Sequence, residues 1–556
     1  MNTTDRRQFL KTSALGAAAL LLTPGAARSA ASDSRIEVLL DETLGTISPN
    51  IYGQFTEHLG TVIYDGVWVG ENSKIPNVRG IRKALVDHLR RINVPIMRWP
   101  GGCFADSYDW KDGVGPRSKR PRRTNFWEDD PEAKRLHEKG PELFDPNTFG
   151  TSEFADFCRQ SGAQLYLAAN VRSLPALDFD HWIAYCNSPA GSTAMADLRA
   201  ADGSRDPFNV RFWGVGNESW GCGGNFMPED YAAEFRRYTT WLPSYGQDLQ
   251  LIASGANDND LDWTHRFFEE IMNPGRRYRN PHFVGWSLHH YAWNLARGKT
   301  TDWVKGKGSA LQFDEVDWYE LFREGYFMEK IITDQWAAIG QYDRDHHIRL
   351  VVDEYGPWYR PGSEVDPAAF YSQQITLRDA AFTAFTLDIF NRHPEKVMLA
   401  ACAQLINCLN SLFLSREDQF MATPVYHVFD MYKGHQGGEA VRAEFSSPEV
   451  HYTRDGQPAT FWGLKGSASR KGNTLTLSVV NADTQKPRET EIVLRGAATA
   501  QSANVITLTN SDIHAHNTFD HPDAVHPATS TATAEGGMLR FTFPPASVTT
   551  LSILLA

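Results

Sequence analysis

The sequence predicts an α/β protein, a (β/α)8 TIM barrel followed by a C-terminal all-β sandwich of jelly-roll type. Eight apolar runs recur between residues 51 and 402 with helical segments between them, which is the pattern of a parallel barrel. From about Gly434, short alternating strands separated by Gly, Asn, Asp and Pro turns replace that pattern. Polar residues follow nearly every apolar run, at the strand ends where such a barrel carries its functional site.

Residues 1–31 are predicted to be a removable signal rather than part of the fold. Arg6 and Arg7 form a twin-arginine motif, residues 14–22 are apolar, and small residues follow at 27–31. The apolar segment is shorter than the roughly 20 residues that a membrane span requires. We therefore expect export by the twin-arginine route, a periplasmic or secreted location, and no membrane attachment after cleavage.

The expected domains are a barrel over residues 50–434 and a sandwich over residues 435–556, with a strand in residues 32–49 that joins the sandwich. Helices are expected at 81–92 and 231–242, where apolar residues repeat at helical spacing. The barrel strands are expected at 51–55, 94–99, 165–170, 212–215, 251–254, 284–288, 350–352 and 398–402. The sandwich strands are expected at 475–479, 492–494, 505–508, 539–543 and 548–555, and residues 526–534 are expected to be a loop.

Composition narrows the kind of ligand. The net charge of -12 disfavours nucleic acid and acidic polymers, because the protein has no surplus of positive charge to neutralise them. A neutral ligand fits better. The chain has 16 Trp, and flat aromatic faces suit the apolar faces of sugars, although most aromatic residues in a large protein belong to the core.

Two glutamates stand at the ends of apolar runs. Residues 211–220 form a buried-strand pattern that ends in Asn217 and Glu218, and residues 349–355 form a second that reaches Glu354. Cleavage of a glycosidic bond needs one neutral acid to protonate the leaving oxygen and one ionised carboxylate to meet the oxocarbenium ion. Either glutamate alone is equally well explained as a solvated or capping residue, so the hypothesis depends on the pair.

Further polar residues are expected at the same end of the barrel. Each buried polar group without a partner costs about 1–3 kcal/mol, so a polar cluster of this size favours a functional explanation. The residues follow strands all around the barrel: Glu57, His58, Arg98, Asn170, Asn257, His289, His290, Tyr291, Asp353, Gln404 and Asn407.

Metal and phosphate sites are not expected. His289 and His290 are adjacent, as are the histidines at 346–347, and neighbouring side chains on a strand point to opposite faces. There is no HExxH or EF-hand motif, and the glycine-rich residues 221–224 lack the lysine of a phosphate-binding loop. We therefore expect neither a metal nor a cofactor.

Several motifs resemble those of the glycoside hydrolase family 51 α-L-arabinofuranosidases. They are RWPGGCF at 98–104, YDWKDGVGP at 108–116, KRP at 119–121, GNE at 216–218 and DE at 353–354. The resemblance covers nearly the whole chain after residue 31. It implies a metal-free, retaining, exo-acting enzyme that releases terminal arabinofuranose from arabinose-containing plant cell-wall polysaccharides or oligosaccharides. It also implies a homo-oligomer, since many members of the family are hexamers.

The resemblance also implies a role for each matching residue. Glu218 is the expected acid/base and Glu354 the expected nucleophile, and Arg98 and Tyr291 are expected to orient the nucleophile. The remaining expected substrate contacts are Glu57, Asn217, Tyr291 and Gln404, with Trp127 and Trp358 as aromatic walls.

Cys103 is the one clear departure from the family, many of whose members carry Asn at this position. If the backbone path is shared, the Cys103 thiol lies at the wall of the sugar pocket and is only a weak hydrogen-bond donor. Otherwise it fills a small buried space. A disulfide is permitted but not demanded by the pattern, and we expect most of the cysteines to be buried thiols. The others are Cys158, Cys186, Cys222, Cys402 and Cys408.

Two other functions remain open at this point. One is another retaining glycosidase on the same scaffold, such as an endo-β-glucanase or a β-xylosidase, because one fold hosts many specificities. The other is a sugar-binding protein with an inactive barrel, against which the presence of Asn217 and both glutamates argues.

Overall fold

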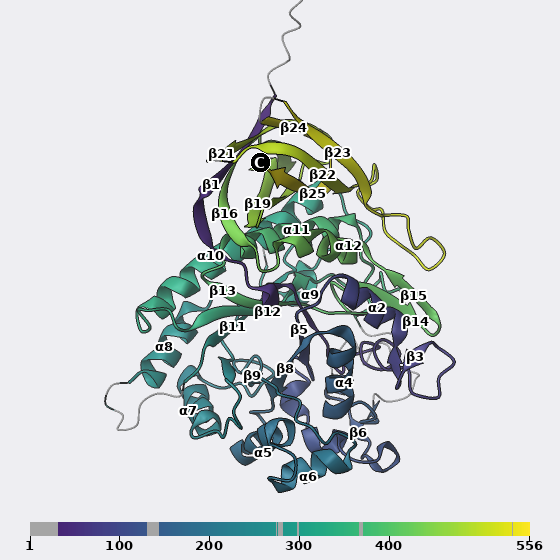
Figure 1. The fold of residues 1–556 in the computed structure, drawn as a ribbon, viewed down its shortest axis with the longest axis vertical. Helices are drawn as coiled ribbons and strands as arrows, with labels where there is room; N and C mark the ends of the chain where they lie inside the picture. The colour runs from purple at the N-terminus through teal and green to yellow at the C-terminus, as the bar shows by residue number, and fades with distance from the viewer. Residues whose placement is uncertain are drawn as a thin grey trace, which may run out of the picture.

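The computed structural model describes residues 32–129, 144–273, 275, 282–296, 300–365, 371–496, 498–535 and 538–556. The predicted signal, residues 1–31, lies outside them. Within the described residues, no helix has both the length and the apolar composition needed to cross a membrane. Figure 1 shows a barrel in the lower part of the molecule and a second, all-β domain above it.

A closed barrel of parallel strands confirms the predicted fold class. All eight strands lie within or beside the apolar runs that predicted them, because strands covered on both faces are apolar throughout. In the order of the closed sheet they are β10 (Gln250–Ala253), β11 (Gly285–Ala292), β12 (Arg349–Pro357), β13 (Val397–Cys402), β2 (Gly53–Phe55), β5 (Ile96–Trp99), β8 (Gln164–Ala169) and β9 (Phe212–Val215).

Helices surround the barrel and bury one apolar face against it. Leu85 and Leu89 of the amphipathic α2 are fully buried, as their helical spacing predicts. The main helices are α2 (Lys83–Arg91), α4 (Thr151–Ser161), α5 (Ala176–Asn187), α7 (Pro228–Thr239), α8 (Leu261–Ile271), α10 (Glu315–Gly340), α11 (Leu377–Arg392) and α12 (Pro424–Tyr432). Helix α11 is buried along most of its length because it lies between the barrel and the β-domain (Figure 1).

The β-domain is one closed sheet that contains both early and late parts of the chain. Strand β1 (Ser34–Thr46) pairs antiparallel with β16 (Glu439–Ser446) and parallel with β21 (Arg488–Arg495). The other strands of this sheet are β19 (Leu464–Lys471), β20 (Thr474–Asn481), β22 (Ala500–Leu508), β23 (Ala528–Glu535), β24 (Met538–Phe543) and β25 (Ser547–Leu555).

One predicted element of this domain is wrong. Residues 526–534 were expected to be a loop, but most of them belong to β23, which pairs with β22 and β24. The segment is rich in β-branched threonine, which favours strands. Its low hydrophobicity hid it from a search for apolar alternation.

A buried polar network joins the barrel to the β-domain. We call Asp388, Tyr432, Ser467 and Ser478 the interface cluster. Oδ1 of Asp388 accepts hydrogen bonds from both serine hydroxyls, and Oδ2 accepts one from the Tyr432 hydroxyl at 3.0 Å. Burial raises the pKa of Asp388 to about 6. One carboxyl group thus receives three hydroxyl donors from three elements.

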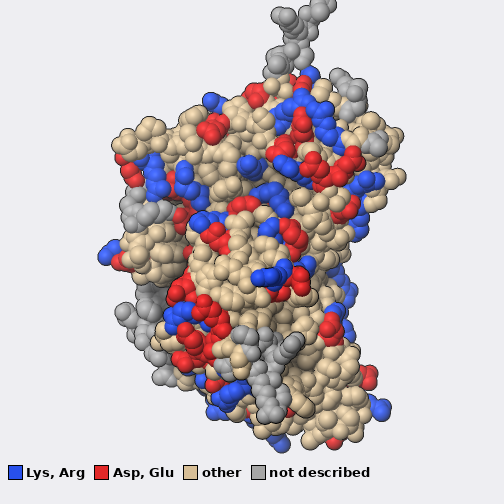
Figure 2. Space-filling view, turned by 90° about the vertical axis from the view of Figure 1, so that its left-hand side faces the viewer, with Lys and Arg blue, Asp and Glu red and all other residues tan. Residues whose placement is uncertain are grey.

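Charged side chains are interleaved over the face of the molecule drawn in Figure 2, with lysine and arginine beside aspartate and glutamate. Exposed ion pairs occur in the described chain, such as Arg35 with Glu37. Exposed pairs of this kind each contribute little to stability, about 0–1 kcal/mol.

Candidate active site

A cavity of about 490 Å³ opens at the carboxyl ends of the barrel strands. Another cavity of about 520 Å³ lies where α11 meets β16 and β19, but there the glutamate Glu329 is paired with Arg392 and His393. The barrel cavity brings together Glu218 and Glu354, the pair predicted from the sequence, so it is the candidate site. Its lining includes Glu57, Cys103, Trp127, Glu218, Trp220, Asn257, His289, Tyr291, Trp293, Trp303, Glu354, Trp358, Tyr371 and Gln404.

Two hydrogen bonds hold the carboxyl group of Glu354, one from a charged guanidinium and one from a neutral hydroxyl. Its Oε1 accepts from Nη1 of Arg98 at 2.8 Å, and its Oε2 accepts from the Tyr291 hydroxyl at 2.8 Å. Hydrogen bonds to a carboxylate favour its ionised form. Nη2 of Arg98 also donates to Oδ1 of Asn217 at 2.6 Å. The buried Arg98 therefore holds Glu354 and Asn217 in fixed positions relative to each other.

An irregularity in strand pairing brings Asp353 and Glu354 to the same arginine. The register between β11 and β12 shifts between Ser287 and His289. Neighbours on a regular strand point to opposite faces, but a bulge re-aims a side chain. Nε of Arg98 lies 3.2 Å from Oδ2 of Asp353, and although burial opposes the charge, both carboxylates raise the pKa of Arg98.

Glu218 faces Glu354 across the cavity. Its Oε1 lies 2.9 Å from Nδ1 of His289, and its Oε2 faces two sulfur atoms. A carboxylate oxygen of Glu218, a ring nitrogen of His289 and a carboxylate oxygen of Glu354 all lie within 4.8 Å of one another. Glu218 has a φ of 41°, a left-handed backbone conformation that is uncommon for a residue with a side chain.

His289 bridges three carboxylates; it was expected among the polar residues at the strand ends, but no role was predicted for it. Its Nδ1 faces Glu218, while its Nε2 lies 3.3 Å from Oδ1 of Asp353. Burial disfavours the charged ring, but Glu354, Asp353 and Glu218 together raise the pKa of His289 to about 10. At neutral pH the ring is therefore an imidazolium.

Glu57 and Gln404 form a second polar wall. Oε2 of Glu57 accepts from Nε2 of Gln404 at 2.8 Å, and Oε1 accepts from the backbone N–H of Phe104 at 3.1 Å. Burial and the nearby Glu354 raise the pKa of Glu57 to about 7. Within the described chain, Oε1 of Gln404 and Nε1 of Trp358 are buried without a protein partner. Unpaired buried groups beside a cavity indicate a hydroxyl-rich ligand.

Aromatic rings form the outer part of the cavity. Trp358 lies edge-on to Tyr291, Trp303 and Tyr371, with ring centroids 4.9 to 5.1 Å apart. Nζ of Lys307 lies 4.2 Å from the ring centre of Trp303 and 4.3 Å from that of Trp358. Such packing fixes flat faces at the mouth of the cavity.

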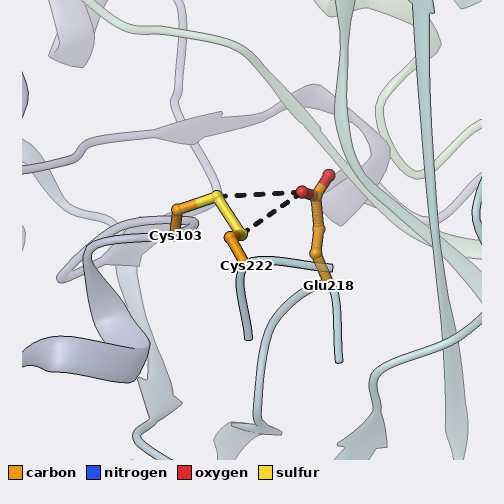
Figure 3. Close-up of side chains that lie close together, drawn as sticks. All are labelled: Cys103, Glu218 and Cys222. Atoms are coloured by element: carbon orange, nitrogen blue, oxygen red, sulfur yellow. Dashed lines mark hydrogen bonds between the residues drawn. A yellow bond between two sulfur atoms is a disulfide. The ribbon is translucent and has the colours of Figure 1, made fainter. Parts of the chain in front are cut away.

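Cys103 is not a free thiol, so neither of the two alternatives left open for it, a thiol at the pocket wall or a thiol in a small buried space, is correct. It forms a disulfide with Cys222, which stands 119 residues away in the sequence (Figure 3). Oε2 of Glu218 lies 3.5 Å from Sγ of Cys222 and 3.8 Å from Sγ of Cys103. A disulfide sulfur carries no hydrogen, so these are packing contacts rather than hydrogen bonds, and the sulfurs are not thiolate metal ligands. The other cysteines are free and buried: Cys158, Cys186, Cys402 and Cys408.

Asp106 is a further residue that the sequence reading missed. It lies in the short helix η2 (Ala105–Ser107) after β5 and is fully buried. Its Oδ1 accepts from the backbone N–H of Val171 at 2.7 Å, and its Oδ2 accepts from that of Asn217 at 2.9 Å. Burial raises the pKa of Asp106 to about 7. This carboxyl group ties the loops after β5, β8 and β9 together.

Not every polar residue at a strand end reaches the cavity. His58 pairs with Asp145 in the core at 2.5 Å, and Asn170 bonds the backbone oxygen of Tyr108. His290 and Asn407 similarly bond neighbouring loops. The predicted site residues that line the cavity are Glu57, Cys103, Trp127, Glu218, Tyr291, Glu354, Trp358 and Gln404.

Comparisons with known proteins agree with one another. Two family profiles match the chain, an α-L-arabinofuranosidase 1 domain over residues 88–296 and an α-L-arabinofuranosidase C-terminal domain over residues 353–547. The chain is 35% identical over 94% of its length to an intracellular exo-α-L-arabinofuranosidase of Bacteroides ovatus, 96% of which is covered. It is 25% identical to an intracellular exo-α-(1→5)-L-arabinofuranosidase of Bacillus subtilis, with 91% of this chain and 96% of that protein covered.

A solved structure gives the same result. The GH51 arabinofuranosidase from Xanthomonas axonopodis pv. citri has a TM-score of 0.85 and 34% identity, and the match covers 94% of this chain and 100% of that chain.

The relatives contradict the predicted location. The proteins from Bacteroides ovatus and Bacillus subtilis are both named intracellular enzymes, so the prediction of a periplasmic or secreted protein is wrong. That prediction depended on two arginines and a short apolar segment within residues 1–31, a brief pattern that matches by chance more readily than a whole domain does.

Proposed function

Because the chain belongs to the glycoside hydrolase family 51 α-L-arabinofuranosidases, we infer that it is a retaining, exo-acting α-L-arabinofuranosidase. Its substrates are glycans that carry terminal arabinofuranose. One geometric observation supports the chemistry: an oxygen of Glu218 and an oxygen of Glu354 lie within 4.8 Å of each other. Retaining glycosidases hold their two carboxyl groups about 5–5.5 Å apart, whereas inverting ones leave room for a water molecule.

We assign Glu354 as the nucleophile and Glu218 as the acid/base. Glu354 attacks the anomeric carbon while Glu218 gives its proton to the leaving oxygen, which produces a glycosyl-enzyme. Glu218 then takes a proton from water, and that water releases the sugar and regenerates Glu354. Two inversions at the same carbon give net retention.

The surroundings of the two glutamates support this division of roles. Glu354 accepts two hydrogen bonds of 2.8 Å, from Arg98 and Tyr291, which fix the position of its carboxyl group and place a positive charge beside it. The imidazolium of His289 faces Oε1 of Glu218, where it stabilises the carboxylate that forms once the proton has left. A positively charged side chain thus lies beside each glutamate, Arg98 beside Glu354 and His289 beside Glu218, and the charge of both glutamates changes during the reaction.

The substrate contacts remain a proposal. We propose that Glu57, Gln404 and the amide nitrogen of Asn217 bind the hydroxyl groups of the arabinose ring. The unpartnered Oε1 of Gln404 supports this role, because a sugar hydroxyl would donate to it. Trp127 and Trp358 form flat walls for the sugar, and Cys103 contacts it through the disulfide rather than a thiol.

We further propose how the chain is organised for this work. The barrel of residues 50–434 carries catalysis, and residues 32–49 with 435–556 form the accessory domain. The enzyme acts as a homo-oligomer, a hexamer being common in the family, and without nucleic acid or a membrane as a partner. Sedimentation velocity tests the assembly, and a monomer at micromolar concentration would contradict it.

The test of the function combines a substrate panel with one variant. The protein should hydrolyse 4-nitrophenyl α-L-arabinofuranoside, and proton NMR should show that the first product keeps the anomeric configuration. 4-Nitrophenyl β-D-xyloside and cello-oligosaccharides should react far more slowly. Glu218→Ala should lose about 10²–10⁴-fold on unactivated glycosides and much less on activated aryl glycosides, which need little protonation. Equal losses on the two classes would refute the assignment of Glu218.

A further inference from the structure

The Cys103–Cys222 disulfide occupies a place that bears directly on proton transfer. Cys103 stands in the loop after β5, and Cys222 stands in the turn after β9 that begins with Glu218 (Figure 3). The backbone oxygen of Glu218 accepts hydrogen bonds from the N–H groups of Gly221 at 2.7 Å and Gly223 at 3.1 Å. The turn that carries Cys222 is therefore folded onto Glu218 itself.

The backbone of Glu218 needs such support. A φ of 41° is disfavoured for a residue with a Cβ atom, and a strained conformation persists only where the surroundings hold it. The turn hydrogen bonds hold one side of Glu218. The disulfide ties that turn to the loop after β5, which forms another wall of the same cavity.

The two oxygens of Glu218 have different neighbours. Oε1 lies 2.9 Å from Nδ1 of His289, and the raised pKa of this ring favours its donating form, in which Oε1 is the acceptor. Oε2 packs against the two sulfur atoms, at 3.5 and 3.8 Å, and neither sulfur has a hydrogen to give. Oε2 is thus the oxygen that is free to carry the proton for the leaving group.

Reduction of the Cys103–Cys222 disulfide would place hydrogen-bond donors beside Oε2 of Glu218. A disulfide accepts two electrons and two protons from a dithiol, which gives two cysteine thiols and an oxidised, disulfide form of the reductant. The new S–H groups can donate to Oε2 of Glu218 and favour its carboxylate over its acid form. The turn would also be released from the loop after β5.

The bond is within reach of such a reductant. Cys103 lines the cavity, and both bonded cysteines are partly exposed, whereas the four free cysteines are buried. Disulfides in reducing compartments are usually transient and are often redox-sensing. The relatives from Bacteroides ovatus and Bacillus subtilis are named intracellular enzymes, so this reactivity matters for a protein of this family.

We propose that the Cys103–Cys222 disulfide is a positioning element for Glu218, and that its reduction by a dithiol weakens proton donation to the leaving group. The proposal rests on the acid/base role proposed above for Glu218. It makes the activity of the enzyme on natural, unactivated linkages sensitive to the thiol redox state.

The test reduces the native enzyme with dithiothreitol and counts the alkylated cysteines by mass spectrometry. Reduction should lower kcat/KM on an arabino-oligosaccharide by about 10-fold and on 2,4-dinitrophenyl α-L-arabinofuranoside by less than about 2-fold, as expected for partial loss of general-acid catalysis. The basic limb of the pH profile should move to lower pH, and reoxidation should restore it. Equal losses on both substrates, or no loss, would overturn the proposal.

Variants cover the case in which the bond resists reduction. Cys103→Ala/Cys222→Ala removes the tether and supplies no donor, whereas Cys103→Ser/Cys222→Ser removes the tether and supplies hydroxyl donors. Both pairs should show the substrate-dependent loss, and only the serine pair should shift the pH profile strongly. Cys158→Ala, a buried free cysteine in α4, is the matched control and should change neither. A failure of Glu218→Ala to discriminate between leaving groups would instead refute the proposed function.

Discussion

Two buried polar clusters lie in different parts of the molecule, one between the barrel and the β-domain and one at the carboxyl ends of the barrel strands, and they treat their carboxyl groups differently. The interface cluster places one carboxyl group, Asp388, among three hydroxyl donors. The second, which we call the active-site cluster, packs three carboxylates against two cations around a cavity. Its members are Arg98, Glu218, His289, Asp353 and Glu354.

The two clusters differ in whether the carboxyl oxygens receive hydrogen bonds from the protein. Every oxygen of Asp388 is satisfied by neutral donors, which favours one fixed arrangement and leaves no reactive group. In the active-site cluster, like charges are crowded together, and Oε2 of Glu218 receives no donor from the disulfide beside it. Crowded charges that face a cavity indicate function, whereas satisfied ones that face protein indicate stability.

The largest effect should come from Glu354→Ala, which separates the two clusters most sharply. We expect turnover to fall by at least about 10⁴-fold, because a nucleophile has no substitute in the first step. Thermal unfolding should show equal or greater stability, because the variant removes one of several crowded carboxylates. Added azide should restore some turnover as a glycosyl azide of inverted configuration. An azide product of retained configuration would mean that the two glutamates have been exchanged in our assignment.

Arg98→Met should damage both activity and stability. It leaves Asp353 and Glu354 buried with His289 but without the Arg98 guanidinium, and breaking a buried pair costs about 3–5 kcal/mol. We also expect kcat to fall by about 10²–10³-fold, because Glu354 loses a fixed donor. Chemical denaturation and steady-state kinetics measure the two losses. A variant that unfolds like the parent protein would show that these charges are not coupled as described.

Asp388→Ala should lower the stability of the protein and leave its activity unchanged. Three hydroxyl groups lose their acceptor, so we expect about 2–3 kcal/mol less stability in urea unfolding. The kcat and KM of the folded enzyme should not change, because the interface cluster lies away from the cavity. A large fall in kcat would show that the interface and the active site are linked.

The interface cluster should also make the stability of the protein depend on pH, through Asp388. Burial raises the pKa of Asp388 from 3.8 to about 6, so the folded state keeps this proton to a higher pH than the unfolded chain does. The stabilisation from this group is complete below its unfolded pKa and is lost as the pH rises through its folded pKa, a change of about 2–3 kcal/mol. Asp388→Asn should flatten the stability curve between these pH values. An unchanged slope would assign the titration to another group.

The smallest effect is expected for Tyr432→Phe. It removes one hydroxyl donor to Asp388 and keeps the ring, so stability should fall by about 1 kcal/mol. Activity should not change. Tyr291→Phe is the matched change in the active-site cluster, where the same lost hydroxyl donated to Glu354 and should lower kcat instead.

The fold was readable from the sequence because apolar runs and helical spacing are local signals. All eight barrel strands coincide with the predicted runs, and α2 and α7 coincide with predicted helices. Strand β23 was missed because threonine and alanine give a strand little hydrophobic contrast.

The site was readable only in part, since its remaining features depend on the three-dimensional arrangement. The partner of Cys103 stands 119 residues away and no motif marks it. The charge on His289 depends on three carboxylates, two on β12 and one in the turn after β9, and the shared contact of Asp353 and Glu354 with Arg98 depends on a register shift. Glu218 and Glu354 could be identified early because their neighbours in the sequence form recognisable motifs.

Strand β1 pairs with strands that are translated much later than β1 itself. Strand β1 leaves the ribosome before the barrel, yet its neighbours β16 and β21 follow it by roughly 400 residues. At about 5–20 residues per second, this first strand waits at least about 20 seconds for a partner while the barrel is being made. An unpaired strand edge can join other chains during that time. Strand β1 is therefore open to pairing with other chains until β16 and β21 have been translated.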